Sequence, residues 1–142
     1  TEKRRAGILF HLAMSRIFEP GQEKSATDWL AKNGLCKDEE AEGICKKITS
    51  LFKQKEFSDF FLQQNFSLNE PEIIGQDGKT NRPDRVVFFP EHTSIIDYKT
   101  GVEKDDYEDQ LTKYQNSIKN LGYSSIKKYI VYVDEERIEE LA

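Results

Sequence analysis

Residues 82–101 read RPDRVVFFPEHTSIIDYKTG and contain two apolar runs separated by a turn. The runs Arg85–Phe89 and Ser94–Tyr98 are rich in Val, Ile and Phe, which predicts two β-strands. The Pro-Glu-His-Thr segment between them predicts the turn that joins the strands. We therefore expect two neighbouring strands of a short meander in this part of the chain.

Charged side chains lie at the ends of these expected strands. Asp97 and Lys99 are two residues apart, so they leave the same face of a strand, and Asp84 is expected beside Asp97 on the preceding strand. Two close carboxylates favour a cation between them, and their hard oxygens suit Mg²⁺ or Mn²⁺. A lysine beside such a pair can orient a water nucleophile or stabilise charge on a phosphate. The alternative is that these are ordinary strand-end charges, which Ile95 and Ile96 make less plausible because they predict a buried strand.

The rest of the sequence predicts helices before these strands and mixed structure after them. The expected elements are helices over 7–18, 27–32 and 38–52 with a further turn or helix through 61, strands over 66–74, 85–89 and 94–98, a helix over 107–121, a strand over 128–133 and a short helix over 135–141. An Asp-Gly pair at 77–78 predicts a hairpin. This order predicts a mixed α/β (α+β) fold with a small central mixed sheet. We expect the chain to form a single domain over 1–142, mainly helical over 1–65 and with the order βββαβα over 66–142.

Composition narrows the class of protein. The chain has 142 residues, a length typical of one domain, and Leu, Ile, Val and Phe make up about a quarter of it, enough for a packed core. No apolar run approaches the length of a membrane span. Cys36 and Cys45 are too few for a disulfide framework, which predicts free thiols in the reducing cytoplasm.

The segment Gly75-x-x-Gly78-Lys79-Thr80 looks like part of a phosphate-binding loop. Such a loop needs a first glycine where this chain has Ile73, and Pro83 interrupts the helix that should follow. We therefore expect a hairpin turn and no ATP site here.

The net charge of −5 argues by itself against a basic nucleic-acid module. Two runs, Glu103–Asp109 and Asp134–Glu140, each hold five acidic residues and leave the remainder of the chain mildly basic. Both runs are expected at the starts of helices, where the helix dipole favours acids. The total charge therefore does not exclude a nucleic-acid substrate.

Three ordered blocks resemble the PD-(D/E)XK nucleases. More narrowly, they resemble the RecB and AddA type nuclease domain found at the C-terminus of UvrD-like DNA helicases. The blocks are Arg82–Val87, Ile95–Gly101 and Tyr107-x-x-Gln110-Leu111-x-x-Tyr114, with Gly7-x-x-x-His11 near the N-terminus. The resemblance implies a restriction-endonuclease-like αβββαβ core with extra N-terminal helices, which agrees with the order of elements read from the residues.

The resemblance also implies roles for individual residues. The implied metal ligands are His11, Asp84, Asp97 and the backbone carbonyl of Tyr98. The implied catalytic residues are Asp84, Asp97 and Lys99, and the implied DNA contacts are Gln110 and Tyr114. Glu70 and Glu72, in the expected strand before the hairpin, are further candidates, one of which is expected to support the metal site. From the residues alone, His11 also reads as a hydrogen-bonded core histidine, and Gln110 and Tyr114 as a polar helix stripe. Arg82 stands where the family often has a glycine, and two cysteines cannot hold the iron–sulfur cluster of some relatives.

The expected function is that of a Mg²⁺- or Mn²⁺-dependent deoxyribonuclease, of exonuclease rather than endonuclease type. Its expected setting is a helicase-nuclease of DNA repair or recombination in the bacterial cytoplasm, associated with the nucleoid. The expected partners are DNA, the motor domains of a parent helicase and a second helicase-nuclease subunit, and no membrane. The alternatives are an inactive nuclease-like module that binds DNA or packs on a helicase, and a plain interaction domain.

Overall fold

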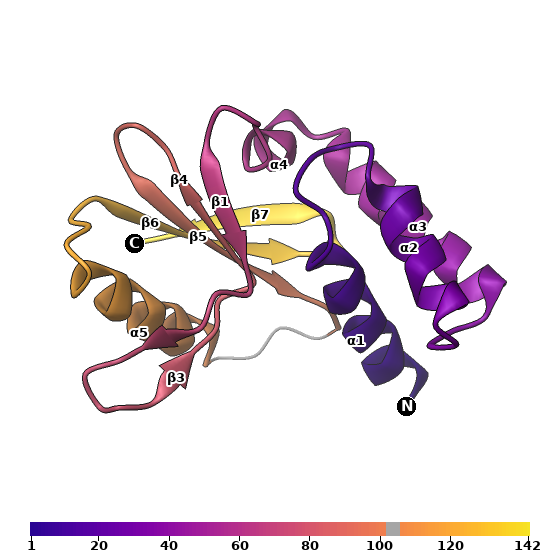
Figure 1. Ribbon diagram of the computed structural model, residues 1–142, viewed down its shortest axis with the longest axis horizontal. Coiled ribbons are helices and arrows are strands. Elements are labelled where there is room, and N and C mark those ends of the chain that lie inside the picture. The colour runs from indigo at the N-terminus through magenta and orange to yellow at the C-terminus, as the bar shows by residue number, and fades with distance from the viewer. Residues whose placement is uncertain (102–105) are drawn as a thin grey trace.

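The computed structural model describes residues 1–101 and 106–142, and its N-terminal part is helical (Figure 1). The helices are α1 (Glu2–Met14), α2 (Glu23–Lys32), α3 (Asp38–Phe52) and α4 (Lys55–Asp59). Side chains cap two of their N-terminal ends: Thr1 Oγ1 accepts from the backbone N–H of Arg4, and Glu40 accepts from that of Lys37. Such caps satisfy N–H groups that a helix leaves unpaired.

A five-stranded sheet follows, in the order β1-β4-β5-β6-β7. Its strands are β1 (Phe66–Asn69), β4 (Arg85–Phe88), β5 (Thr93–Lys99), β6 (Ile126–Tyr132) and β7 (Arg137–Leu141). β5 and β6 are parallel, and the other neighbours are antiparallel. Helix α5 (Tyr107–Lys119) lies between β5 and β6 in the sequence, as a parallel crossover requires. A small hairpin of β2 (Ile73–Ile74) and β3 (Thr80–Asn81) contacts α5.

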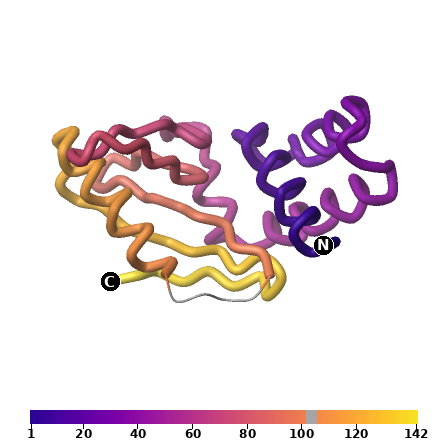
Figure 2. The backbone as a smooth tube through the Cα atoms, turned by 90° about the horizontal axis from the view of Figure 1, so that it is seen from below, coloured from indigo at the N-terminus to yellow at the C-terminus, as the bar shows by residue number. Residues whose placement is uncertain are grey.

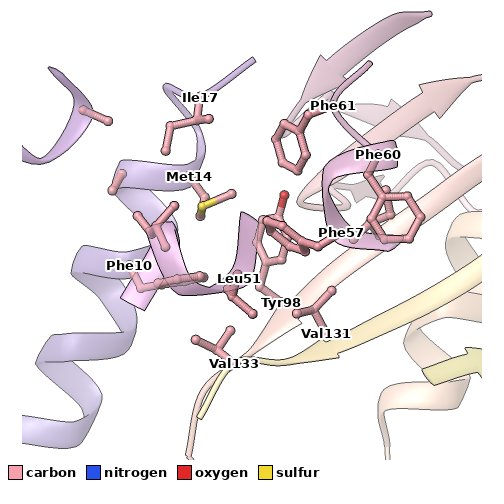
Figure 3. Close-up of a cluster of buried hydrophobic side chains, with 14 of the residues drawn as sticks. Phe10, Met14, Ile17, Leu51, Phe57, Phe60, Phe61, Tyr98, Val131 and Val133 are labelled. Atoms are coloured by element: carbon pink, nitrogen blue, oxygen red, sulfur yellow. The ribbon is translucent and has the colours of Figure 1, made fainter. Parts of the chain in front are cut away.

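Helices cover both faces of the sheet (Figure 2). In the first core, the four helices α1–α4 pack against the sheet face that carries Val87, Ile96, Tyr98 and Val131. Figure 3 shows Phe10, Met14 and Phe57 gathered around Tyr98 in this core. The second core joins α5 with the face that carries Val86, Ile95 and Ile130. Because consecutive residues face opposite sides, β5 is buried on both faces.

The mixed α/β architecture predicted from the sequence is confirmed, and it is consistent with a restriction-endonuclease-like fold. The predicted helix over 135–141 is wrong, because Arg137–Leu141 forms β7 and pairs with β6. Ile138 packs on the first core and Leu141 on the second, so pairing with a buried strand overrides the local sequence pattern. The acidic run Asp134–Glu140 therefore occupies a turn and an edge strand, and the run Glu103–Asp109 lies partly outside the described residues.

The predicted strand over 66–74 is also wrong in its extent. β1 ends at Asn69, and Glu70 adopts a left-handed backbone with φ of 49°. This conformation breaks a strand, so Ile73 and Ile74 belong to the small hairpin instead. Within the described residues, no helix is long and apolar enough to cross a membrane.

Candidate active site

Two carboxylates lie side by side at the end of the sheet where β4 begins and β5 ends. Asp84 directly precedes β4, one residue outside the strand on which it was expected, and Asp97 lies on β5. Each is held by the backbone of the other segment. The Asp84 N–H donates to Asp97 Oδ1 at 3.0 Å, and the Tyr98 N–H donates to Asp84 Oδ2 at 2.8 Å. The antiparallel pairing of β4 with β5, with Arg85 opposite Ile96, places them together.

The Asp97 side chain is only 3% exposed. Burial, followed by the negative charge of Asp84, raises the pKa of Asp97 well above its usual range, and Lys99 offsets this only in part. The two carboxylates therefore lie close enough to repel each other, with Lys99 beside Asp97. This is an environment that favours a cation.

Lys99 lies next to this pair. Its Nζ is 3.4 Å from Asp97 Oδ2 and donates to Gln110 Oε1 at 2.9 Å. The same ammonium lies 4.4 Å from the centre of the Tyr107 ring, within the range of a cation–π contact. Gln110 and Tyr107 both belong to the first turn of α5. The helix that covers this face of the sheet thus holds the lysine beside the carboxylate.

Tyr114 lies one turn further along α5 and is buried. Burial raises the pKa of Tyr114 above its ordinary value, and the negative charges of Asp97 and Asp84 raise it further. Its hydroxyl is therefore neutral and within electrostatic reach of both carboxylates. The structure places Gln110 and Tyr114 at the same site, on the same helix face.

Helix α1 brings His11 to the opposite side of the carboxylates. His11 Nε2 lies 2.8 Å from the Tyr98 carbonyl oxygen and 3.4 Å from Asp84 Oδ2, while Nδ1 lies 2.8 Å from the Gly7 carbonyl oxygen. Burial lowers the pKa of His11, but Asp84 and the two carbonyls together raise it more, to about 9. A carbonyl oxygen only accepts, so both ring nitrogens donate and the imidazole carries a positive charge.

Once His11 Nε2 gives up its proton, these donor atoms suit a hard divalent cation. The His11 nitrogen, an Asp84 oxygen and the Tyr98 carbonyl oxygen are separated by 2.8 and 3.4 Å, close to the separation of about 3 Å between adjacent ligands of an octahedral Mg²⁺. Three or more His, Cys, Asp or Glu side chains arranged to hold a metal do not occur within 1–101 and 106–142. The donors that converge are two side chains and one backbone carbonyl, with Asp97 next to them.

The two further candidates fall in different places. Glu70 lines the same groove as His11 and Thr100, and its backbone N–H donates to the Asp84 carbonyl oxygen at 3.0 Å. Glu72 instead pairs with Arg82 beside the hairpin. The structure therefore brings Glu70 toward the carboxylates, whereas the hairpin segment engages Glu72.

Arg85, which is buried, and Asn69, which is half-buried, lie at this site. The sequence patterns did not single out either residue for a role. Arg85 is 1% exposed and donates to the Phe60 carbonyl, Asn69 Oδ1 and Ser67 Oγ, with its guanidinium over the Phe61 ring. The Asn69 amide in turn faces three carbonyls at the end of α1, the nearest at 2.8 Å. This chain of contacts ties the helix that carries His11 to the strand that follows Asp84. The only sequence signal for this role was the position of Arg85 directly after the motif aspartate Asp84.

Gly7 is a second residue whose role only the structure reveals. A Cβ at this position would lie 2.5 Å from Thr100 Oγ1, which is shorter than any ordinary contact. The missing side chain lets α1 approach the end of β5, and the Gly7 carbonyl then orients the His11 ring. The glycine therefore permits the contact between His11 and Tyr98.

An Asp and an Asp-x-Lys triplet on adjacent segments of a mixed sheet, with helices on both faces, define the class of restriction-endonuclease-like nucleases. A family model of the PD-(D/E)XK nuclease superfamily matches residues 1–141. The chain belongs to this superfamily, whose members are typically nucleases that use divalent metals. Comparison with curated proteins finds no match.

Proposed function

We propose that this protein is a divalent-metal-dependent nuclease that hydrolyses the phosphodiester bonds of DNA at the site formed by His11, Asp84, Asp97 and Lys99. The observation that carries the proposal is the reciprocal hydrogen bonding of Asp84 and Asp97, with Lys99 Nζ 3.4 Å from Asp97. Two close carboxylates, one buried and one half-buried, supply the hard oxygens that suit a divalent cation, and a DNA phosphate brings further negative charge to the same place.

In this proposal His11, Asp84, Asp97 and the Tyr98 carbonyl hold Mg²⁺ or Mn²⁺. When bound, such an ion polarises a phosphoryl oxygen and lowers the pKa of water. Lys99 donates from its ammonium to the attacking water or to a phosphate oxygen, where negative charge develops. Asp97 and Gln110 fix the position of that ammonium, and Gln110 and Tyr114 orient the DNA strand. The Tyr98 side chain anchors the strand end in the core, so its carbonyl stays aimed at His11.

We also propose a finer placement, in the RecB and AddA type of helicase-nuclease. The sequence Asp-Tyr-Lys-Thr-Gly over 97–101, the spacing of Gln110 and Tyr114, and His11 on the first helix support it. This placement gives an exonuclease of DNA repair or recombination in the bacterial cytoplasm. Its partners would be helicase motor domains and a second subunit.

A second candidate is a module that binds DNA or packs on a helicase without cleaving. One observation favours it: Asp97 and Lys99 already engage each other and their neighbours, and the described residues contain no group of three side chains arranged for a metal. Metal binding and cleavage together distinguish the two candidates.

The deciding experiment measures both properties on the same preparations. Cleavage of end-labelled single- and double-stranded DNA is followed with Mg²⁺ or Mn²⁺, and Mn²⁺ binding is measured by calorimetry. We expect Asp97→Asn and Lys99→Ala to reduce cleavage by about 10²- to 10³-fold, and Asp84→Ala to abolish Mn²⁺ binding. Asp59→Asn and Lys55→Ala, which alter an exposed ion pair on α4, are matched controls and should retain activity. Mn²⁺ binding without cleavage in the wild type would favour the second candidate.

A further inference from the structure

A groove of about 830 Å³ runs along α1 and ends at the candidate active site. Gly7 and His11 of α1 line it together with Thr100 and Glu70. Lys3 and Arg4 lie at its outer end, on the turn of α1 that precedes Gly7. The lining residues of α1 extend from Lys3 to Leu12 and include His11, and Figure 1 shows α1 beside the sheet.

The two cations of this groove differ from five other cations of the helical region. Arg5, Lys24, Lys46, Lys47 and Lys55 are each paired with an acid. Lys3 and Arg4 are exposed, and neither forms an ion pair with any residue in the described ranges 1–101 and 106–142. Glu70 is the one carboxylate among the described residues that line the groove. The groove is thus positively charged, although the whole chain is acidic.

Apolar side chains accompany these charges. Ile8 is 55% exposed, and it lines the groove together with Leu12. A basic groove with exposed apolar side chains suits a single nucleic-acid strand, whose phosphates meet the cations while its unstacked bases contact the apolar surface. A duplex keeps its bases stacked inside and offers no such contact.

A second groove, on the other side of the site, is less suited to phosphates. It lies between the hairpin and α5, and Arg82 and Lys113 face Asp106 and Asp109 there. Arg82 is also paired with Glu72. The balanced charge of this second groove leaves the α1 groove as the favourable path for a polyanion.

We propose that the α1 groove binds the backbone of single-stranded DNA adjoining the bond to be cleaved, with Lys3 and Arg4 on phosphates and Ile8 and Leu12 against bases. The inference rests on the proposed function, because the groove leads the strand to His11. Arg4 and Lys3 precede His11 by seven and eight residues, so their phosphate contacts fall about 10–12 Å from the site along the helix axis. The groove would therefore hold the strand outside the reacting centre.

Binding without metal tests this inference separately from cleavage. Anisotropy of a fluorescent oligothymidylate is measured with the full chain in EDTA, over a series of salt concentrations. We expect the double variant Lys3→Glu/Arg4→Glu to weaken binding at least tenfold. The slope of log affinity against log salt should also fall by about 1.4, because two phosphate contacts on a single strand are lost.

Lys32→Glu/Lys53→Glu is the matched control, because it changes the net charge equally at the end of α2 and just after α3, outside the groove. This control should change affinity less than threefold, and equal losses in both double variants would overturn the proposal. Ile8→Ser should weaken binding, while Ile74→Ser, at an exposed isoleucine on the hairpin, should not. Equally tight binding of a duplex probe would also overturn it. If the wild type binds the oligonucleotide through Lys3 and Arg4 but never cleaves with metal, the proposed function fails while the groove assignment stands.

Discussion

His11 Nε2 lies 2.8 Å from the carbonyl oxygen of Tyr98, a residue 87 positions further along the chain. The other ring nitrogen faces the Gly7 carbonyl at the same distance. An imidazole between two acceptors carries both protons, and Asp84 at 3.4 Å compensates its charge. The metal-free protein therefore keeps a positive charge where we propose that the metal binds.

This arrangement predicts that His11 titrates near pH 9 in the metal-free protein. The chain contains only two histidines, so an NMR titration resolves them directly. Burial, together with Lys127, lowers the pKa of His92, which provides an internal reference. Asp84→Asn should lower the pKa of His11 markedly and leave that of His92 unchanged. A His11 pKa near 6.5 in the wild type would contradict the hydrogen bonding described here.

The same groups predict how stability depends on pH. The folded-state pKa of His11 is raised above its unfolded value, so its stabilising contribution is complete below about pH 6.5 and is lost as pH rises through about 9. The raised pKa of Asp97 acts in the same direction, from about pH 4 upward. Urea unfolding in EDTA should therefore show stability falling from pH 5 to pH 9. Asp97→Asn should flatten this profile and make the protein more stable than the wild type at pH 8. A variant less stable than the wild type at pH 8 would argue against charge repulsion between Asp84 and Asp97.

The close approach of Gly7 to Thr100 predicts a specific clash and its rescue. Gly7→Ala should destabilise the fold by about 1–3 kcal/mol, because the new Cβ would lie 2.5 Å from Thr100 Oγ1. Adding Thr100→Ala removes that oxygen and leaves an ordinary 3.6 Å contact with the Thr100 Cβ, so the double variant should recover most of the loss. Adding Thr100→Val to Gly7→Ala keeps a methyl group where the hydroxyl was, so this combination should not recover the lost stability. Thermal unfolding of the three variants and the wild type provides the measurement.

How much of the fold and of the candidate site could be predicted from the sequence depends on how far apart in the chain the interacting residues lie. Local patterns predicted the strands around Asp84 and Asp97 and the helix that carries Gln110, because alternation and helical spacing are properties of neighbouring residues. β7 was missed because its acidic sequence becomes a strand only by pairing with β6. The break at Glu70 was missed because a left-handed glutamate has no sequence signature. The roles of Arg85 and Asn69 depend on contacts with α1 and α4, which no pattern within 66–89 could reveal.

Those contacts of Asn69 give the final prediction, which concerns the position of His11. The Asn69 amide nitrogen faces the carbonyls of Met14, Ser15 and Ile17, and its oxygen accepts from Arg85. Asn69→Asp keeps the acceptor for Arg85 but replaces the donor that faces α1 with a carboxylate oxygen, which those carbonyls repel. We expect the first helix to shift, and Mn²⁺ affinity measured by calorimetry to fall at least tenfold, as when a supporting contact of a metal ligand is lost. Ser67→Ala, which removes a different partner of Arg85, should cost about 1 kcal/mol of stability and leave Mn²⁺ affinity unchanged. If the two variants lower Mn²⁺ affinity equally, Asn69 supports only the fold and does not position His11.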